Sequence, residues 1–587
     1  MKPRRPSARG GGGTAARPTG GIARANGPLP LRHPAHVAAM TAAAACIALI
    51  VCVRILDTDL WQHLAVGRAI WSTLRIPTTQ VWSWPTYGAP DVNSSWGFEA
   101  LLWWAWRLGG VAGLDAWRIG TALVAFGLAW LTARRLGARG LAALAVAVLG
   151  ALVVHRRTQL RPETWVGVLF ALQLWVLETR RQGGRDLGWL LLPIAWAWAN
   201  SHISYTLGFA VLALHLGDGW LGGPARRTGT RRLALLALAA LALSFANPFG
   251  WRALAQPFDF LARQRQAAIF ANIEELRPLD WSRNLRTGLP LVMFGWPLLL
   301  LWRARREGVD RVELATCLLF SVLALRVQRF VTFYGIAMTP YLARDLDRFV
   351  RAVRWPRATE PAWSRFALAT AAGAACLGMV ATDPHEPIAF GLEQRLIPIG
   401  ACDFMQAHGV RGRGFNHFFL GGYLLHRFWP ERDRLPFMDV HQSGGPRIQD
   451  QYVRALASPA GWRTLRERHG IEWALLWRVQ VPGDLGLDAL DADTTFRLVF
   501  ADDVAALYVR RAGPLAAVAD SFGYRTLACG ERGFTRLGLG WQADPALRRA
   551  AHAELARAAA SSPWNEWATR WRDASADSSP GVRPFGR

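Results

Sequence analysis

Two carboxylates and an imidazole lie together directly after the first apolar stretch of the chain. Residues 57–64 read DTDLWQHL, so Asp59 and His63 are four positions apart and share one face of a helix. Carboxylates in such a place can hold a divalent metal such as Mg²⁺ or Mn²⁺, orient a sugar, or accept a proton from an attacking hydroxyl. The pattern also fits a simpler role, in which Asp57 or Asp59 caps the helix that runs on to Trp71. The segment by itself leaves these roles open.

Glu99 is a further candidate acid in an apolar setting. It lies in residues 96–109, an apolar stretch in which Glu99 and Arg107 are the charged residues. A carboxylate in such a helix, after a long aromatic loop, favours a structured site at a membrane interface. The alternative is that Glu99 extends its carboxylate to the interface or pairs with Arg107.

A cluster of arginines lies in the next loop between apolar segments. Residues 155–163 read HRRTQLRPE and include Arg156, Arg157 and Arg161. A planar guanidinium binds phosphate or pyrophosphate through two parallel hydrogen bonds, so these arginines are candidate ligands for a lipid phosphate. Contact with bulk lipid headgroups is the other interpretation. Glu163 is the only acid in this loop.

Three later loops carry the remaining candidates. His202 lies in a tight turn between apolar runs, where a histidine is more often a satisfied turn residue than a catalyst. Arg326 and Arg329 flank the last short turn between apolar segments and could also reach a phosphate. Residues 274–281 read EELRPLDW and predict either a lid or a solvated loop.

Composition indicates which elements position these side chains. The 587 residues carry 68 Lys and Arg against 42 Asp and Glu, a net charge of +26, yet 52% of them are hydrophobic and 30 are Trp. Collagen-like, disordered and disulfide-scaffold proteins are excluded, and a soluble nucleic-acid binder would explain the charge but not the tryptophans. Residues 1–383 hold 43 basic and 20 acidic residues, net +23, which leaves +3 for residues 384–587. The pattern is typical of a polytopic membrane protein with a polar domain, without a nucleic-acid partner.

Eleven apolar segments predict an all-α membrane domain of about eleven transmembrane helices over residues 36–383, although several are shorter than the roughly 20 residues of a straight span. They lie near residues 36–55, 114–133, 140–155, 163–178, 187–199, 203–218, 231–246, 288–303, 311–326, 330–344 and 365–382. Residues 1–35 are rich in Gly, Pro and Arg without an acid and predict a disordered basic tail in the cytoplasm.

The numbers of Lys and Arg residues in the loops predict which face of the membrane each loop occupies. If residues 96–109 form an interfacial or re-entrant helix and do not cross, the cytoplasmic segments carry 27 Lys and Arg against 14 in the opposite loops, whereas a crossing reverses the bias. Eleven spans then place the C-terminal region outside. The same face receives residues 56–113, 155–163, 199–203, 247–287 and 326–330. We therefore expect Asp57, Asp59, Arg161 and Glu163 to share one cavity.

The polar C-terminal region has the alternating pattern of a small extracytoplasmic α/β domain, placed at residues 384–511. Strands are predicted for residues 413–416, 435–439, 473–478, 496–500 and 505–510, and helices for residues 418–428, 448–457 and 460–469. Asp502 and Asp503 indicate a hairpin between the last two strands. Residues 512–587 predict a helical segment, strongest near 545–560, and a disordered tail.

Three smaller features of this region leave alternatives open. Gly421 and Gly422 favour close helix packing rather than a nucleotide site, because their spacing is not that of a dinucleotide-binding loop. Residues 439–441, DVH, could bind a metal or ligand or form a turn at a strand end. Cys402 and Cys529 form either one disulfide or two free thiols.

The segments together resemble a bacterial membrane-protein family that is placed with the GT-C superfamily of polyprenyl-phosphate-sugar-dependent glycosyltransferases. Residues 57–68, DTDLWQHLAVGR, are similar to the family's opening D-x-D-x-W-x-H-L-x-x-G, although Gln62 stands where a second aromatic residue is expected. Further landmarks are Ile76-Pro77, Trp82-Ser83, WGFE at residues 96–99, Arg161-Pro162, WANSH at residues 198–202, NPFGW at residues 247–251, and residues 329–340. The resemblance covers roughly residues 36–511.

The resemblance implies an inverting transfer of a hexose or pentose from a polyprenyl-phosphate donor to a glycan, lipid or protein acceptor, on the outer face of a bacterial inner membrane. Asp57 and Asp59 match the acidic position that GT-C enzymes carry in the first outer loop, and Glu163 loosely matches a second acidic site. Asp57 or Asp59 would then be the general base or hold a divalent metal, with His63 and Glu99 orienting them.

The implied donor site is cationic. Its members would be Arg156, Arg157, Arg161, His202, Arg326 and Arg329 around the lipid phosphate. The C-terminal domain would recognise the acceptor.

Two other functions fit a polytopic chain: a transporter or flippase of a lipid-linked saccharide, and a non-catalytic scaffold of the same fold. A transporter predicts charged groups at mid-membrane and internal repeats. The sequence instead predicts ionisable residues at one membrane face and carries no clear repeat.

Overall fold

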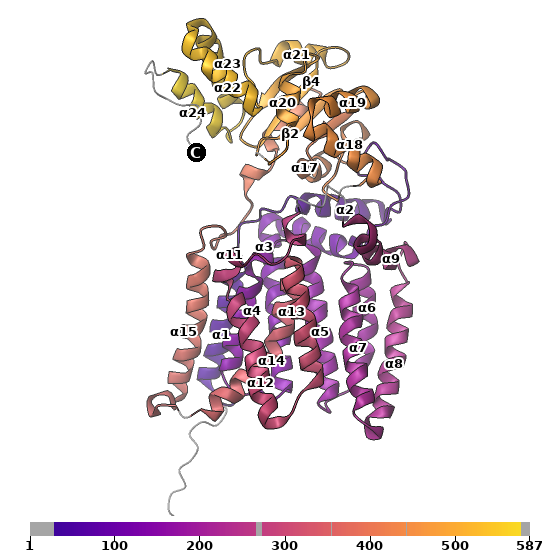
Figure 1. Cartoon of the computed structure of the whole chain (residues 1–587), viewed down its shortest axis with the longest axis vertical. Helices are drawn as coiled ribbons and strands as arrows, with labels where there is room; N and C mark the ends of the chain where they lie inside the picture. The colour runs from indigo at the N-terminus through magenta and orange to yellow at the C-terminus, as the bar shows by residue number, and fades with distance from the viewer. Residues whose placement is uncertain (1–28, 266–272, 354, 442, 480, 577–587) are drawn as a thin grey trace, which may run out of the picture.

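The computed structural model describes residues 29–265, 273–353, 355–441, 443–479 and 481–576. Figure 1 shows a bundle of long helices joined to a smaller α/β unit that contains the C-terminal helices. The end of the bundle that faces this unit is called the upper end, and the opposite end the lower end. Most of the predicted tail at residues 1–35 lies outside the described residues, as does the end of the chain from residue 577.

Each of the eleven predicted apolar segments coincides with a helix of the bundle. The helices are α1 (Pro34–Ile50), the second half of α3 (Trp96–Arg135), α4 (Ala142–Val154), α5 (Pro162–Arg181), α6 (Leu191–Ala199), α7 (Tyr205–Leu221), α8 (Pro224–Ser244), α12 (Leu289–Glu307), α13 (Arg311–Arg326), α14 (Val331–Ala352) and α15 (Ala362–Ala381). Their buried Ala, Val, Leu and Phe side chains form one continuous core. α14 is central, because it packs against α3, α4, α5, α12 and α13.

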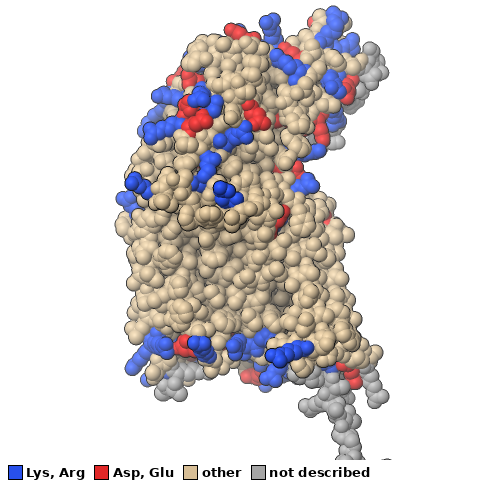
Figure 2. All heavy atoms as spheres, turned by 180° about the vertical axis from the view of Figure 1, so that it is seen from behind, with Lys and Arg blue, Asp and Glu red and all other residues tan. Residues whose placement is uncertain are grey.

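The surface of the bundle is apolar. By length and hydropathy, α3 and α15 can cross a bilayer, and the bent pair Trp281–Thr287 and Leu289–Glu307 (75°) raises the number to three among the described residues. Only 11% of the apolar window of α15 is buried, so most of this helix faces outward. Figure 2 shows a broad band without charged side chains between a charged lower rim and the charged upper unit. Such an apolar belt requires lipid around it, so the protein is embedded in a membrane. The count of eleven spans stays a prediction.

Gly110 divides α3 into two arms. Its φ of 54° and ψ of −133° lie outside the helical region and suit a glycine. The chain folds back so closely that a Cβ on Gly113 would lie 2.0 Å from the carbonyl oxygen of Ala105. The first arm is the stretch predicted as an interfacial or re-entrant helix.

α2 (Asp59–Thr73) lies across the upper end of the bundle (Figure 1). It packs tightly on the first arm of α3, because a Cβ on Gly67 would lie 2.3 Å from the carbonyl oxygen of Glu99. The first arm is in turn fixed to the turn after α6, where Trp96 Nε1 donates to Asn200 Oδ1 (2.9 Å) and the Gly97 amide donates to the Asn200 carbonyl (2.9 Å). Three separate landmark segments of the sequence therefore meet at this end.

The upper unit is built on a four-stranded mixed sheet. Its strands are β1 (Gly414–Asn416), β2 (Trp473–Trp477), β3 (Phe496–Ala501) and β4 (Ala505–Arg510), in the order β1-β2-β4-β3, with β1 parallel to β2 and the other pairs antiparallel. The helices around it are α16 (Ile399–Ala407), α17 (Phe418–Phe428), α18 (Gly445–Ala457), α19 (Pro459–His469), α20 (Gly486–Asp491), α21 (Ala516–Phe522), α22 (Glu531–Ala543), α23 (Pro545–Ser561) and α24 (Glu566–Ala576). The predicted hairpin is confirmed, because Asp502 Oδ1 accepts from the amides of Val504 and Ala505 at the β3–β4 turn.

The predicted strand at residues 435–439 is wrong, since these residues are irregular in the structure. A side chain takes the place of a neighbouring strand. Asn416 Oδ1 accepts from the amides of Phe437 (2.8 Å) and Met438 (3.3 Å), and its Nδ2 donates to the Met438 carbonyl (2.7 Å). The backbone polar groups are thereby satisfied without a ladder.

The linker between the two units is held to the bundle by isolated β-bridges from Val53 to Ile388 and from Ile55 to Leu392. Cys402 and Cys529 are free thiols, as are the other four cysteines.

The two units also meet where α17 packs on the start of α2. A Cβ on Gly422 would lie 2.9 Å from the carbonyl oxygen of Thr58, and one on Gly421 would lie 2.5 Å from that of Met438, which confirms the predicted close packing. Gln62 Nε2 donates to Asp439 Oδ2 (2.7 Å), and its Oε1 accepts from the amide of Val440 (3.0 Å). The residue that departs from the family pattern thus binds the upper unit.

Candidate active site

Seven charged side chains and one histidine form a network at the upper end of the bundle, here called the upper ionic cluster. Its members are Asp57, Asp59, Arg157, Arg161, Glu163, His202, Glu275 and Arg329. They come from five segments that are far apart in the sequence. Three of them lie in short 3-10 helices, η1 (His155–Arg157), η4 (Glu274–Leu276) and η6 (Gln328–Phe330), which turn the chain between longer helices.

Arg161 is the centre of one half of this cluster. α5 begins at Pro162, so Arg161 is the last extended residue before the helix. Its Nε donates to Asp57 Oδ2 (2.7 Å) and its Nη2 to Asp57 Oδ1 (3.1 Å), while Nη2 lies 3.3 Å from Asp59 Oδ2. Asp57 Oδ1 also accepts from the amide of Asp59 (3.1 Å), so Asp57 both holds Arg161 and satisfies the first turn of α2.

Glu275 connects this half to Arg329. Its carboxylate accepts from Arg161 Nη1 and from Arg157 Nη1 (3.3 Å), and lies 3.6 Å from Arg329 Nη1. Arg329 Nε donates to Glu163.

His202 belongs to the other half of the cluster, around Arg329. Its Nε2 lies 3.3 Å from Arg329 Nη2 and 3.6 Å from Glu163 Oε1. The loops that carry Asp57 and Glu163 therefore share one ionic network, while the expected common cavity stays a prediction.

Exposure separates the members of the cluster. The side chain of Asp57 is 1% exposed and that of Glu163 7%, whereas Asp59, Arg161 and Arg329 are 30%, 28% and 29% exposed. One carboxylate and two guanidinium groups are therefore accessible to a ligand, while the buried carboxylates hold the arginines from behind.

The two aspartates differ in their proton affinity. Burial opposes ionisation of Asp57, but the charge and hydrogen bonds of Arg161 outweigh it and lower the pKa of Asp57. Burial, together with the negative charge of Asp57, raises the pKa of Asp59 although Arg161 opposes this. Asp57 therefore stays charged as the counter-ion of Arg161, while Asp59 is the carboxylate better suited to accept a proton.

Near neutral pH, Arg161 stays charged and His202 stays neutral. Burial lowers the pKa of His202 to about 4, with Arg329 adding to this effect, so the imidazole is neutral. Burial opposes the charge of Arg161, but Asp57, Glu275 and Asp59 hold its pKa well above the ordinary value.

Asp57 and Asp59 do not offer an open place for a metal ion. Both oxygens of Asp57 already accept from Arg161, and the nearest oxygen of Asp59 faces the same guanidinium. Arg161 supplies the positive charge that a cation would bring. The residues therefore do not fit a divalent ion in this arrangement, and Mg²⁺ or Mn²⁺ at these two residues stays a prediction from the sequence.

Four predicted site residues lie outside the upper ionic cluster. Arg156 pairs with Asp383 of the linker (2.5 Å), and Arg326 is exposed and has no ion pair among the described residues. His63 and Glu99 form their own pair, with His63 Nδ1 2.9 Å from Glu99 Oε1.

Glu275 is the member that the sequence did not identify. It lies beside Glu274, whose side chain is 50% exposed against 16% for Glu275. Two adjacent glutamates in a polar loop look alike in the sequence, so only their different burial separates them.

A second network, here called the lower ionic cluster, lies at the opposite end of the bundle. Its members are Glu178, Arg181, Arg303, Asp310, Glu313, Arg344 and Asp345, from α5, α12, α13, α14 and the turn before α13. Arg344 Nε donates to Asp345 (2.7 Å) and Arg181 donates twice to Asp310 (2.9 Å each). The expectation that ionisable residues lie at one membrane face is therefore wrong, because this cluster was not recognised in the sequence.

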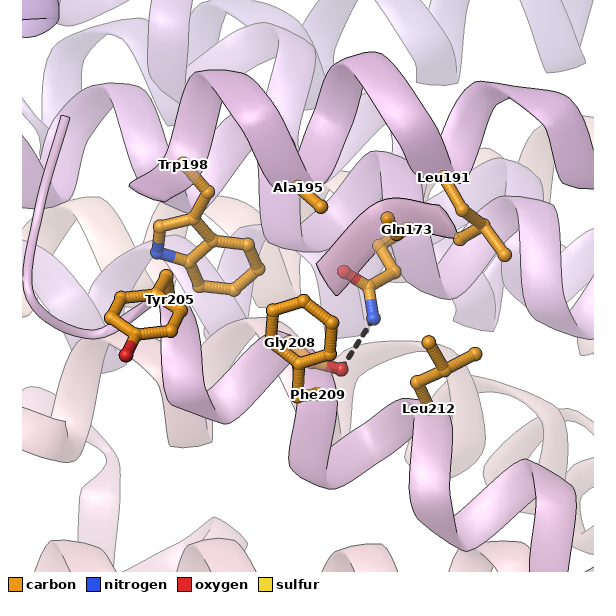
Figure 3. Close-up of a pocket in the computed structure, with 9 residues that line it drawn as sticks. Gln173, Leu191, Ala195, Trp198, Tyr205, Gly208, Phe209 and Leu212 are labelled. Carbon is orange, nitrogen blue, oxygen red and sulfur yellow. Dashed lines mark hydrogen bonds between the residues drawn. The ribbon is translucent and has the colours of Figure 1, made fainter. Parts of the chain in front are cut away.

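A narrow hollow lies among α5, α6, α7 and α8 (Figure 3) and is apolar apart from Gln173, whose Nε2 donates to the Gly208 carbonyl (2.6 Å). Its wall residue Trp198 donates from Nε1 to Ser204 Oγ (3.1 Å), which lies 2.7 Å from His202 Nδ1. The hollow contains no member of either ionic cluster, so the charged chemistry lies outside it.

Comparison with known proteins identifies solved structures that have a similar fold. No protein-family model matches the sequence, and no curated protein sequence matches it. The oligosaccharyltransferase AglB from Archaeoglobus fulgidus, solved with an inhibitory peptide and a dolichol-phosphate, matches with a TM-score of 0.53 and 11% identity over 82% of this chain and 74% of that one. The same enzyme solved with Zn and sulfate matches with a TM-score of 0.51 and 12% identity over 80% and 73%.

ArnT from Cupriavidus metallidurans, solved with undecaprenyl phosphate, has a TM-score of 0.45 and 13% identity over 82% of this chain and 98% of that one. At 11% and 12% identity, the two AglB structures show that this chain shares their fold. The individual sequence motif is not tested by them and stays a prediction.

Proposed function

We propose that this chain is an integral-membrane glycosyltransferase that transfers a sugar from a polyprenyl-phosphate donor to a glycan, lipid or protein acceptor on the outer face of a bacterial inner membrane. The observation that carries the proposal is the upper ionic cluster, in which two accessible guanidinium groups lie beside an accessible carboxylate at one end of a GT-C-type fold. AglB was solved with a dolichol-phosphate, a ligand of the same chemistry.

The donor phosphate would bind to Arg161 and Arg329. Each has a side chain that is about as exposed as that of Asp59, and each is held from the other side by a buried carboxylate, Asp57 or Glu163. A phosphate that arrives therefore meets oriented donors and does not have to order them. Arg157, fixed by Glu275, adds charge at the edge of the site.

Asp59 would be the general base. It accepts the proton of the acceptor hydroxyl as the acceptor oxygen forms a bond to the anomeric carbon, while the bond from that carbon to the phosphate oxygen breaks. Polyprenyl phosphate leaves with the electron pair, and Arg161 and Arg329 stabilise its charge. A single displacement of this kind inverts the anomeric centre. No step requires a metal ion at Asp57 and Asp59.

The experiment compares surface glycans and glycoproteins by mass spectrometry in cells that lack the protein and in cells that regain wild-type or the Asp57→Asn, Asp59→Asn double variant. The expected result is a glycan change that wild-type reverses and the variant, present at equal amounts in the membrane, does not. Restoration by the variant would contradict sugar transfer and favour the scaffold.

The transporter alternative is separated in vitro. Purified protein in lipid nanodiscs, given a panel of undecaprenyl-phosphate hexoses and pentoses, is expected to release undecaprenyl phosphate only when an acceptor is present. Movement of intact donor across vesicles without this release would contradict the proposal.

A further inference from the structure

A group of metal-ligating side chains lies at the seam between the bundle and the upper unit. His63 of α2, Glu99 of α3 and His441 of the loop after η9 (Arg432–Arg434) each offer one ligand atom, and these atoms lie within 4.8 Å of one another. Residues 439–441 had two predicted roles, a strand-end turn or a metal or ligand site. The structure brings this segment beside two of the residues singled out in the first outer loop.

The surroundings of this group are rich in carboxylates. Asp91 interacts electrostatically with Asp439, His441 and Glu99, so three carboxylates lie around the two imidazoles. Among the described residues none of these carboxylates pairs with an arginine. The carboxylates of the upper ionic cluster, by contrast, all pair with arginine. Among the described residues the one ion pair of these carboxylates is that of Glu99 with His63 (2.9 Å), so a bound metal ion would balance the remaining negative charge.

We propose that His63, Glu99 and His441 bind a zinc ion that joins the helix bundle to the upper unit. Two imidazoles with one carboxylate, and a position left open for water, are the donor set that Zn²⁺ prefers over Mg²⁺ or Ca²⁺. The proposal does not depend on sugar transfer, because the three ligands lie outside the upper ionic cluster.

The geometry needs one adjustment. Ligand atoms of a tetrahedral zinc ion with bonds of about 2.0–2.1 Å lie roughly 3.4 Å apart, so the longest separation, up to 4.8 Å, has to shorten by as much as about 1.4 Å. His441 is exposed, and a rotation of its side chain can supply this movement. The exposed side also lets the ion enter from solvent.

The residues around the ligands are already oriented. Asn93 Nδ2 donates to Glu99 Oε2 (2.6 Å), which leaves Oε1 on the side of His63. Gln62 holds the segment before His441 through Asp439 and Val440. Such outer partners fix the direction of the ligands before the ion binds.

The test measures zinc in purified full-length protein. The protein in lipid nanodiscs is stripped with a chelator, reloaded with zinc chloride, freed of unbound metal and analysed by mass spectrometry for metal content. Wild-type is expected to retain one zinc per chain and to unfold at a higher temperature with zinc than without it. His441→Ala is expected to lose more than about 100-fold in zinc affinity, because the loss of an outer partner alone costs 10–100-fold.

The matched control is His385→Ala, since His385 is an exposed histidine of the linker outside the cluster. It is expected to bind zinc like wild-type. Two results would overturn the proposal: wild-type that retains no stoichiometric zinc, and zinc binding that survives His441→Ala but is lost in Asp57→Asn, Asp59→Asn. A failure of the glycan experiment would leave these measurements unaffected.

Discussion

The upper and lower ionic clusters contain the same charges in different surroundings. Each has three arginines and four carboxylates, and each joins helices that are distant in the sequence. In the lower cluster no side chain is more than 16% exposed, whereas Asp59, Arg161 and Arg329 of the upper cluster are 28–30% exposed. The number of charged residues therefore does not distinguish a structural cluster from a ligand-binding site, but the exposure of their side chains does.

The physical reason is how far a ligand can reach the arginines of each cluster. In the lower cluster Arg344 donates to Asp310, Glu313 and Asp345, and a further donor, Arg303, serves two of the same carboxylates. The network closes on itself, and breaking one buried pair leaves an unpaired charge. In the upper cluster Arg161 also pairs with three carboxylates, Asp57, Asp59 and Glu275, but Arg161 and Arg329 remain 28% and 29% exposed, so a phosphate can reach their exposed edges.

The largest expected effect is on catalysis by the upper cluster. Asp59→Asn removes the general base and is expected to lower the rate of undecaprenyl phosphate release by about 10²–10⁴-fold. Because Asp59 is 30% exposed, the unfolding temperature should change little. If Asp59→Asn instead lowered the unfolding temperature and kept the wild-type release rate, the upper cluster would be structural and not catalytic.

The lower cluster should respond in the opposite way. Arg344→Met leaves Glu313 and Asp345 with Arg303 alone and is expected to cost about 3–5 kcal/mol of unfolding free energy. Release of undecaprenyl phosphate per folded molecule should stay within about twofold of wild-type, since the lower cluster lies at the opposite end of the bundle and shares no residue with the upper one. The unfolding free energy is measured by denaturant unfolding in nanodiscs, and the release rate is measured on the folded fraction. An unchanged unfolding free energy would show that the lower cluster does not stabilise the bundle.

A smaller effect is expected for an arginine that binds the donor phosphate. Arg329→Lys keeps the charge but loses the planar fork, and should raise the KM for the donor about tenfold with a smaller change in kcat. Arg326→Lys is the matched control, because Arg326 lies three residues earlier and outside the cluster. Equal effects of the two substitutions would mean that bulk charge, and not the cluster, attracts the donor.

The smallest effect concerns pH. Because the pKa of Asp59 is raised, the rate should be present above that pKa and lost as pH falls through it, at a higher pH than for an ordinary aspartate. His202, with a pKa of about 4, adds no limb near neutral pH. Glu275→Gln removes a negative charge that raises the pKa of Asp59 and should move the acid limb down by less than about one pH unit.

Glu274→Gln is the control for this shift, because Glu274 pairs with Arg283 outside the cluster. The pH–rate profile of kcat/KM measures both variants. An acid limb that stays in place in Glu275→Gln would mean that a group other than Asp59 is the base.

Periodicity and composition predicted the helices and most strands, but the partners of charged residues were harder to predict. Arg156, Arg157 and Arg161 look equivalent in one loop, yet the first pairs with the linker and the others with Glu275. The difference depends on which distant loops the fold brings near.

The lower cluster escaped prediction for a related reason. Its members lie at the ends of apolar helices, where Arg, Asp and Glu ordinarily mark the edge of a span. Their burial comes from packing among four helices and leaves no local signature. The irregular segment at residues 435–439 shows the same limit, since the Asn416 side chain that replaces a strand lies about twenty positions away.

The central helix α14 (Val331–Ala352) sets a constraint on how this chain can change. Arg329, just before it, belongs to the upper cluster, and Arg344, within it, belongs to the lower one. A helix turns about 100° per residue, so one inserted or deleted residue between them would rotate one end against the other and detach a whole network. The number of residues between these two arginines is therefore constrained by both networks at once.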